Sequence, residues 1–306
     1  MKKSLVGYTG FVGTNIADSC HFDGLYNSQN IESAYGTKPD LLVYSGVPAE
    51  MFLANNNPSA DLAVIEQAAE NICKISPKRL VLISTIAVLD DVDRVDEDHI
   101  VDTEKLSDYG LHRYKLEQMA QEIIPSCHIL RLPALFGKSI KKNFIYDMLH
   151  FFPAMLNQAK YETFLATEAI IADCYKLQDN GFYKLQLTEE KKDELRAAFK
   201  RLDFSALNFT DSRSIFQFYN LAHIWEHIEL VIAKQIPLLH LAVEPLSAGE
   251  VYRELCGRPF VNEVGQKPFN YNYRTKHDTC FGGENGYIYN REQVLSDLKP
   301  FVEEAK

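Results

Sequence analysis

The sequence predicts an α/β fold, in which a doubly wound parallel sheet is followed by a smaller, mostly helical C-terminal domain. Two observations lead to this prediction. Short apolar runs alternate with helical patterns through the first half of the chain, and a glycine-rich turn joins the first run to the first helix. Strands and helices that alternate in this way form parallel sheets with right-handed crossovers, whose buried strands are apolar throughout.

Each element of the first half is predicted from its own pattern. Continuous apolar runs such as D-L-L-V-Y and R-L-V-L-I-S are typical of buried parallel strands. They predict strands at residues 3–7, 24–27, 40–44, 79–84 and 127–132. Between the strands, the spacing of apolar residues favours amphipathic helices. These are predicted at residues 11–20, 61–75 and 109–123.

The pattern changes after residue 137. Residues 143–206 are predicted to be mainly helical, with the charged stretch 189–201 as a solvated helix. Further on we expect an extended stretch at 215–220, helices at 223–234, 247–256 and 293–304, a strand at 238–243 and an irregular segment at 268–286. The first predicted domain comprises residues 1–140, with 215–245 returning to it. The second comprises residues 141–214 and 246–306.

Composition limits the partners and the compartment. The 306 residues carry a formal net charge of −10, and an acidic surface repels polyanions, so neither nucleic acid nor an anionic membrane is an expected partner. No apolar run approaches the ~20 residues of a membrane span. The six cysteines are scattered and include no C-x-x-C pair. They are typical of reduced thiols, and we expect a soluble, cytoplasmic protein without a metal site.

A glycine motif, G-x-x-G-x-x-G, occupies the turn between the first strand and the first helix. Gly7 permits a tight reversal, Gly10 lets the backbone approach a pyrophosphate, and Gly13 lets the helix pack against the strand. The helix then presents unpaired N–H groups and the positive end of its dipole. The motif predicts a Rossmann domain that binds NAD or NADP, whereas the alternative is a tight turn without a ligand. Further cofactor contacts are predicted at Thr9, Phe11 and Val12.

The end of the second predicted strand bears on the choice of cofactor. NAD enzymes usually place an acidic residue here, against the adenosine ribose. This chain has Asn27 and Ser28 instead. Asn27 can hydrogen-bond a ribose hydroxyl, and the missing carboxylate removes repulsion toward a 2′-phosphate, but no arginine stands beside it. The sequence therefore leaves NAD and NADP open.

Several motifs together resemble the extended short-chain dehydrogenase/reductase family, the NAD-dependent nucleotide-sugar epimerases and dehydratases. The glycine turn has that family's spacing. The segment L-I-S-T-I-A-V at 82–88 is similar to the strand that delivers a catalytic Ser/Thr, which maps to Thr85. The segment Y-G-L-H-R at 109–113, with Glu117 beyond it, resembles the family motif Y-G-x-x-K-x-x-x-E. The run R-L-P at 131–133 resembles the strand and loop past the nicotinamide.

The resemblance implies hydride transfer between a sugar carbon and the nicotinamide. It implies that Tyr109 acts as acid or base on the sugar hydroxyl and that Thr85 positions that oxygen, while a cation at position 113 lowers the phenol pKa and holds the nicotinamide ribose. A dehydratase would place an Asp-Glu pair after Thr85, where this chain has Ile86 and Ala87. The implied protein is an epimerase or reductase of a nucleotide-linked sugar, and a homodimer. Further implied cofactor contacts are Gly46, Ser84, Leu132 and Pro133.

The sequence departs from the family at position 113, where Arg replaces Lys. Tyr109 and Arg113 are four residues apart, so a helix places them on one face, while His112 is expected to point outward. Arg keeps the charge, but it is longer and planar, and the exchange is not conservative at a tight site. A catalytically impaired NAD(P)-binding sensor or scaffold is therefore the alternative function. The alternatives to a catalytic role are an aromatic residue packed into the core for Tyr109 and, for Thr85, a strand-end hydroxyl that bonds to backbone.

Three further residues are candidate substrate contacts. Asn143 stands where family members present an amide to substrate, and the alternative for this stretch is a plain helix N-terminus. Arginines bind phosphate in a bidentate manner, which makes Arg213 and Arg274 candidates for the diphosphate of a sugar nucleotide. The pair His223 and His227 has a spacing that suits a metal, but no carboxylate completes the set, so a packed or solvated helix face is expected there.

Overall fold

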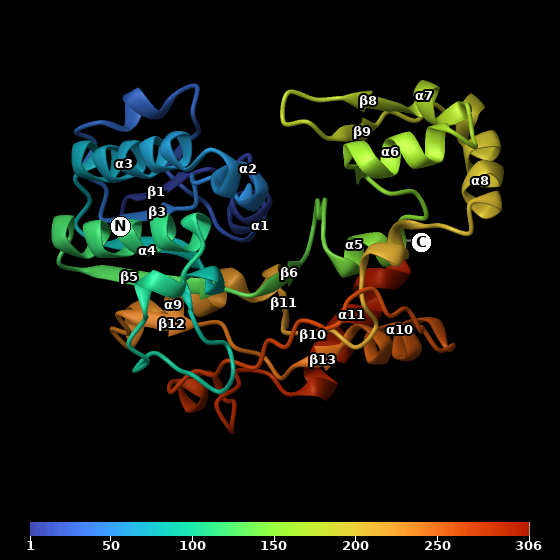
Figure 1. The fold of residues 1–306 in the computed structure, drawn as a ribbon. Coiled ribbons are helices and arrows are strands. Elements are labelled where there is room, and N and C mark those ends of the chain that lie inside the picture. The colour runs from blue at the N-terminus through green and yellow to red at the C-terminus, as the bar shows by residue number, and fades with distance from the viewer. Residues whose placement is uncertain (306) are drawn as a thin grey trace. The chain divides into compact units, whose positions relative to one another are not determined.

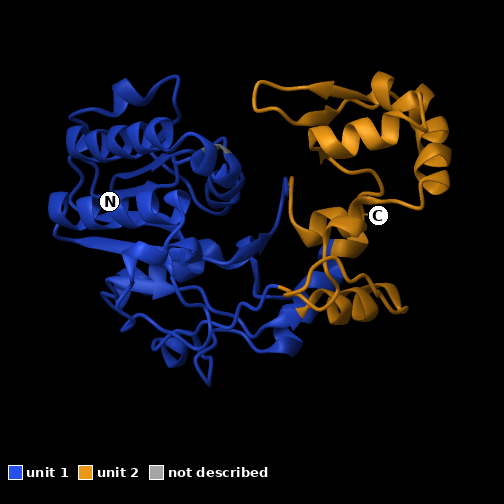
Figure 2. Ribbon diagram, viewed as in Figure 1, with its two compact units in different colours: residues 1–140, 215–246, 269–301 blue, residues 141–214, 247–268, 302–306 orange. Residues whose placement is uncertain are grey.

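A computed structural model describes residues 1–305, apart from the side chain of Leu53, and Figure 1 shows the order of its elements. The chain divides into two compact units. The first unit comprises residues 1–140, 215–246 and 269–301, and the second comprises residues 141–214, 247–268 and those from 302 onward (Figure 2).

Residues 269–301 lie in the first unit, whereas the sequence placed them in the second domain. The reason is backbone pairing with the loop at 92–95. The N–H groups of Asn272 and Arg274 donate to the carbonyl oxygens of Val92 and Val95 at 2.8 and 2.7 Å. Pairing between segments so far apart in the sequence leaves no local pattern from which it could be predicted.

A six-stranded parallel sheet forms the centre of the first unit, with the strand order β12-β5-β4-β3-β1-β2. Leu5 of β1 lies opposite Leu25 of β2 on one side and Val43 of β3 on the other. The predicted doubly wound α/β fold is thereby confirmed. The strands are β1 (Lys3–Val6), β2 (Gly24–Tyr26), β3 (Leu41–Tyr44), β4 (Leu80–Thr85), β5 (Cys127–Leu132) and β12 (Leu238–His240).

Two helices, α3 (Pro58–Ile75) and α4 (Asp108–Ile123), pack together over one face of this sheet. Side chains of the strands and of both helices share one buried cluster there. α3 begins three residues before its predicted start, because Asn57 accepts a hydrogen bond from the Ala60 N–H and Pro58 suits the first helical position. The cluster includes Leu42, Leu82, Ile65, Ile72 and Leu116.

Two other helices of the first unit, α1 (Phe11–Ser19) and α9 (Ile224–Ala233), pack against each other. Close by, Phe22 meets Trp225 edge to face, with ring centroids 5.4 Å apart. The remaining elements of this unit are short. They include α2 (Met51–Asn56), β6 (Ala134–Phe136), β10 (Ile215–Phe216), β11 (Phe218–Asn220) and the 3-10 helices η1 (Ile31–Ala34), η2 (Ile86–Val88), η3 (Thr103–Lys105), η6 (Leu221–His223) and η7 (Asp278–Phe281). The strand β13 (Leu246–Ser247) and the helix α11 (Arg291–Glu304) each end in the second unit.

The second unit is less helical than predicted for residues 143–206. It holds an antiparallel sheet of β7 (Met155–Leu156), β9 (Tyr183–Leu185) and β8 (Tyr175–Leu177). These strands are two or three residues long, too short for an alternating pattern to be visible in the sequence. Gly181, with a φ of +80°, provides the left-handed turn between β8 and β9.

An aromatic core centred on Phe199 joins this sheet to its helices. The helices of the second unit are α5 (Phe144–Leu149), α6 (Gln158–Leu165), α7 (Ile170–Cys174), α8 (Lys192–Arg201) and α10 (Ala248–Cys256), with the 3-10 helices η4 (Glu189–Lys191) and η5 (Ala206–Phe209). No helix in the described chain, residues 1–305, is both long and apolar enough to cross a bilayer.

Candidate active site

The glycine turn after β1 has no room for side chains at two of its positions. Gly7 has a φ of +89°, and a Cβ there would lie 2.5 Å from the Ser45 carbonyl oxygen. A Cβ on Gly13 would lie 2.0 Å from the carbonyl oxygen of Gly7. The absence of side chains at these two positions lets the turn and the start of α1 lie close against β1 and the loop after β3, as the motif predicts.

The start of α1 has the character of an anion site. Gly10 is the N-cap residue, and no side chain caps the helix there. The first N–H groups of a helix have no partner within the helix, so they and the positive end of the dipole favour a phosphate group. The predicted contacts Phe11, Val12 and Gly13 form the first turn of this helix. The turn therefore fits the diphosphate of a dinucleotide.

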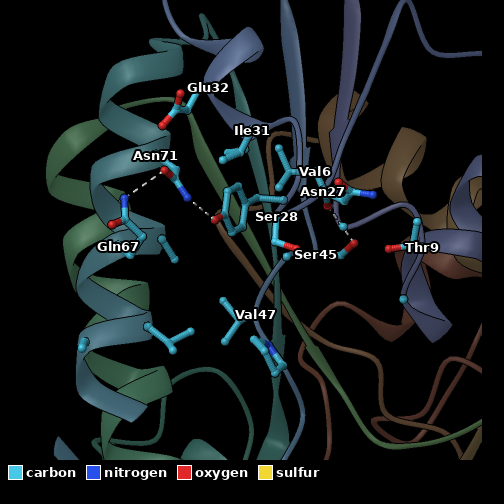
Figure 3. A pocket seen from close by; sticks show the side chains of 18 of the residues that line it. Val6, Thr9, Asn27, Ser28, Ile31, Glu32, Ser45, Val47, Gln67 and Asn71 are labelled. Carbon is cyan, nitrogen blue, oxygen red and sulfur yellow. Dashed lines mark hydrogen bonds between the residues drawn. The ribbon is translucent and has the colours of Figure 1, made fainter. Parts of the chain in front are cut away.

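A pocket of about 770 Å³ opens beside this turn. Within the sheet, β1 has β2 as its neighbour on one edge and β3 on the other, so the strand order reverses direction at β1. Ligands of open α/β sheets bind at such a switch point. Figure 3 shows Thr9, Asn27 and Ser28 on one side of the pocket and Gln67 and Asn71 of α3 on the other. Of the predicted cofactor contacts, those that line it are Gly7, Thr9, Gly10, Asn27, Ser28 and Gly46.

Polar side chains that the sequence did not single out also line the pocket. Asn71 donates to the Tyr44 hydroxyl at 3.3 Å and accepts from Gln67 at 3.1 Å (Figure 3). Val64, Gln67 and Asn71 recur at three- and four-residue intervals on α3 and so share one face. That spacing was the available signal, but nothing in the sequence indicated that this face would meet a ligand.

The charge on the pocket wall is negative. Among the described residues that line the pocket, Glu32 of η1 carries the one carboxylate, and none is Lys, Arg or His. Asn27 shapes the loop beside it, because its Oδ1 accepts from the Gln29 N–H at 2.9 Å. NAD enzymes usually place an acid directly at the end of this strand, where the chain has Asn27 and Ser28. Glu32 instead supplies a carboxylate five residues beyond Asn27.

Thr85, Tyr109 and Arg113 lie together at the carboxyl end of β4. Thr85 ends that strand, and its Oγ1 accepts from the Ala87 N–H at 3.2 Å. A Cβ on Gly110 would lie 2.2 Å from the Ala87 carbonyl oxygen, so glycine lets α4 approach the turn that follows Thr85. The Arg113 guanidinium lies over the Tyr109 ring, with Cζ 3.9 Å from the ring centroid.

The electrostatic setting of Tyr109 differs from the expectation for a cation-assisted phenol. Burial raises the pKa of the phenol above its ordinary value. The Arg113 charge opposes this shift, the Asp61 carboxylate adds to it, and hydrogen bonds with Arg113 and Thr85 lower the pKa again. The balance is a raised pKa, opposite in direction to the one the family resemblance implied.

Arg113 is buried and bonded to protein groups. It is 5% exposed, and its Nη1 donates to the Asp61 carboxylate on α3. Its Nη2 donates to the Pro48 carbonyl oxygen at 2.8 Å, while Nε is buried without a hydrogen-bond partner. His112 also contacts Asp61, with Nδ1 2.8 Å from Oδ2. The expectation that His112 points outward is therefore wrong, because this buried carboxylate draws it inward.

A series of buried, hydrogen-bonded polar side chains links the carboxyl ends of β4 and β5. Ser84 donates to Glu117 at 2.5 Å, and Arg131 binds both oxygens of Glu117 at 2.6 to 3.2 Å. Arg131 Nη1 lies 3.2 Å from Nε2 of His240 on β12, and burial lowers the pKa of that imidazole. Ser84 thus contacts a carboxylate, and neither it, Leu132 nor Pro133 lines the pocket.

The three predicted substrate contacts have partners within their own units. In the second unit, Asn143 caps α5 by accepting from two N–H groups at its start. Arg213, also in that unit, donates to the carboxylates of Asp211 and Glu263 and to the Gly265 carbonyl oxygen. In the first unit, Arg274 donates to the Asn285 carbonyl oxygen and lies over the Tyr287 ring.

The two histidines at the start of α9, His223 at the end of η6 and His227 within the helix, are bonded to other side chains. His223 bonds Asp297 at 2.7 Å, and His227 lies between the hydroxyls of Tyr219 and Tyr289 at 2.7 and 3.1 Å. Within residues 1–305, no group of three His, Cys, Asp or Glu side chains is arranged to hold a metal ion.

Comparison with known proteins gives a match in fold. No family model and no curated protein matches the sequence. A dTDP-4-dehydrorhamnose reductase from Yersinia enterocolitica is similar over 100% of both chains, with a TM-score of 0.64 and 12% identity. The Bacillus anthracis dTDP-4-dehydrorhamnose reductase, in complex with NADP, has a TM-score of 0.63 and 15% identity over 99% of each chain.

A UDP-glucose 4-epimerase from Thermotoga maritima, with UDP-glucose, is similar with a TM-score of 0.59 and 12% identity. That match covers 99% of this chain and 98% of the epimerase. At such identities the likeness establishes the fold. The predicted resemblance to the extended short-chain dehydrogenase/reductases is therefore confirmed for the fold.

Proposed function

We propose that this protein is an NAD(P)-dependent epimerase or reductase that acts on a nucleotide-linked sugar. One observation carries the proposal: a glycine turn that excludes side chains lies in one pocket with the carboxyl ends of β1, β2 and β3. The fold adds support, because reductases and an epimerase of nucleotide sugars share it. The open first turn of α1 suits the diphosphate of NAD or NADP.

In this proposal the bound nicotinamide supplies or accepts the hydride. The chain's own groups bind and move protons around it. Amides at the start of α1 hold the diphosphate, and Asn27 and Ser28 meet the adenosine ribose. Tyr109 exchanges a proton between its phenol oxygen and the sugar hydroxyl, while Thr85 Oγ1 orients that hydroxyl.

The wall charge favours NAD over NADP. A 2′-phosphate brings additional negative charge to the ribose end of the pocket. Glu32 repels it there, and none of the lining residues in the part of the chain that the structure describes is a cation that could neutralise it. The 2′-hydroxyl of NAD, by contrast, can donate a hydrogen bond to a carboxylate.

Binding and turnover test the proposal separately. Calorimetry of the purified protein with NAD, NADH and NADPH measures affinity, and absorbance near 340 nm follows hydride transfer with UDP-, GDP- and dTDP-sugars. Tyr109→Phe removes the proton-exchanging oxygen, so turnover should fall by about 100-fold or more while NADH still binds. Absence of dinucleotide binding, or a Tyr109→Phe protein with normal turnover, would contradict the proposal.

A second candidate is a catalytically impaired NAD(P)-binding sensor or scaffold. The observation that favours it is Arg113, whose two Nη atoms bond to Asp61 and Pro48 beside a phenol with a raised pKa. This candidate predicts tight NADH binding with no turnover of any sugar nucleotide. A gain of turnover in Arg113→Lys would indicate lost catalysis, and a loss of turnover would indicate a site adapted to arginine.

A further inference from the structure

We propose that Arg113 is a positioning residue, which fixes two walls of the cofactor pocket by joining helix α4 to Asp61 of α3 and to the loop after β3. This inference deepens the proposed function and rests on it, because the pocket concerned is the one assigned to the dinucleotide. The resemblance, by contrast, implies that position 113 serves Tyr109 and the nicotinamide ribose.

The two ends of the guanidinium reach different elements. Nη1 donates to Asp61 in the first turn of α3, and Nη2 donates at 2.8 Å to the carbonyl oxygen of Pro48, four residues past the end of β3. The plane of the group lies against the Tyr109 ring. Asp61 receives a second buried partner, because His112 Nδ1 is 2.8 Å from the same carboxylate oxygen.

Both elements that Arg113 holds are walls of the pocket. Pro48 lines it directly, together with Ser45, Gly46 and Val47 of the same loop. The other wall is a face of α3 that begins with Ala63, two residues beyond Asp61. Arg113 itself does not line the pocket. It therefore acts on a ligand through the loop and the helix, and not by touching it.

The geometry also gives a reason for arginine at this position. A guanidinium presents several donors in a rigid planar fork, so one side chain can bond a carboxylate and a carbonyl while its plane stacks on an aromatic ring. A lysine ammonium is a single point of charge and cannot occupy both acceptor positions and stack in this way. The partner Asp61 thus gives a physical reason why this chain has arginine at position 113, where the family motif has lysine.

The test uses two probes that differ in the nicotinamide half. AMP carries the adenosine and one phosphate, whereas NAD also carries the nicotinamide ribose. Affinities for both are measured by calorimetry with the full chain, for the wild type, Arg113→Lys, Asp61→Asn and the double variant. Asp40→Asn is the matched control, because Asp40 pairs with Lys78 at the opposite end of β3. Circular dichroism verifies the fold of each variant, and the isosteric Asp61→Asn carries the test should Arg113→Lys not fold.

A positioning role predicts that Arg113→Lys and Asp61→Asn each weaken AMP and NAD by the same factor, about tenfold, and that the double variant is no weaker than either. Asp40→Asn should bind as the wild type does. Unchanged AMP affinity with weakened NAD would overturn the inference, because it would place Arg113 at the nicotinamide ribose. A wild type that binds neither probe would refute the proposed function. Amide exchange at Gly46 and Val47 would then decide the inference, with faster exchange in Asp61→Asn supporting it and equal exchange overturning it.

Discussion

The buried pair of Glu117 and Arg131 allows a prediction of stability whose size follows from the structure. Glu117 is 2% exposed and Arg131 4%, and hydrogen bonds of 2.6 to 3.2 Å join them. Glu117→Gln keeps the shape of the side chain but removes its charge, so the Arg131 guanidinium stays buried without a counter-ion. Removing one partner of a buried ion pair costs about 3–5 kcal/mol of unfolding free energy.

For a chain of this length, that loss should lower the unfolding midpoint by about 5–8 °C. Circular dichroism and urea titration at pH 7 measure it, and the urea midpoint should fall without a change in slope. The control is Glu70→Gln, which removes an exposed partner of Lys74 four residues along α3. Such surface pairs contribute little, so the control should unfold like the wild type. If Glu117→Gln lowered the midpoint no more than Glu70→Gln, the reasoning from burial would be refuted.

Three further predictions concern the pocket and pH. Gly13→Ala, whose Cβ would lie 2.0 Å from the Gly7 carbonyl oxygen, should weaken NADH binding at least about tenfold. The control is Gly265→Ala, whose Cβ would lie 3.8 Å from the nearest atom beyond its chain neighbours and should leave NADH binding unchanged. Equal NADH affinities of the two variants would exclude a tight turn at Gly13. Glu32→Arg should raise the affinity ratio of NADPH to NADH by about tenfold, and Glu66→Arg, on α3 outside the pocket lining, should leave it unchanged. Burial, aided by the nearby His223, lowers the pKa of His227 to about 3, so the unfolded chain binds a proton below about pH 6.5 that the folded chain does not. The contribution of neutral His227 to the free energy of unfolding is therefore complete above pH 6.5 and falls by about 1.4 kcal/mol per pH unit as the pH decreases toward 3. In urea titrations at pH 6.5 and 5.5, the free energy of unfolding should fall less between the two pH values for His227→Gln than for the wild type. Equal decreases would contradict the lowered pKa.

The parts of the fold that could be predicted are those written in local patterns. The five strands of the first half are short, mainly apolar runs, and Gly7 and Gly13 mark the place where strand and helix must touch. The contacts of Arg113 could not be predicted, because Asp61 lies 52 residues away and nothing near it indicates a partner. The same holds for His112, whose burial depends on that carboxylate.

The second unit was the least predictable part for a different reason. Its strands are too short to show a period, and its sheet depends on contacts around an aromatic core that includes Phe199 and Tyr175. Glu32 was missed because an acid was sought at the end of β2, and η1 carries one a few residues later. In both cases the sequence contained the residues, but their placement depends on how the chain turns in three dimensions.

The order of the central sheet has a consequence for synthesis of the chain. Five strands have been synthesised once residue 132 is added, but β12, which pairs with β5, follows only at residues 238–240. During that interval the outer edge of β5 has open N–H and C=O groups, and such edges pair readily with other chains. A nascent chain that pauses between β5 and β12 should therefore be a preferred substrate for chaperones, and slow translation over this stretch should lower the yield of native protein.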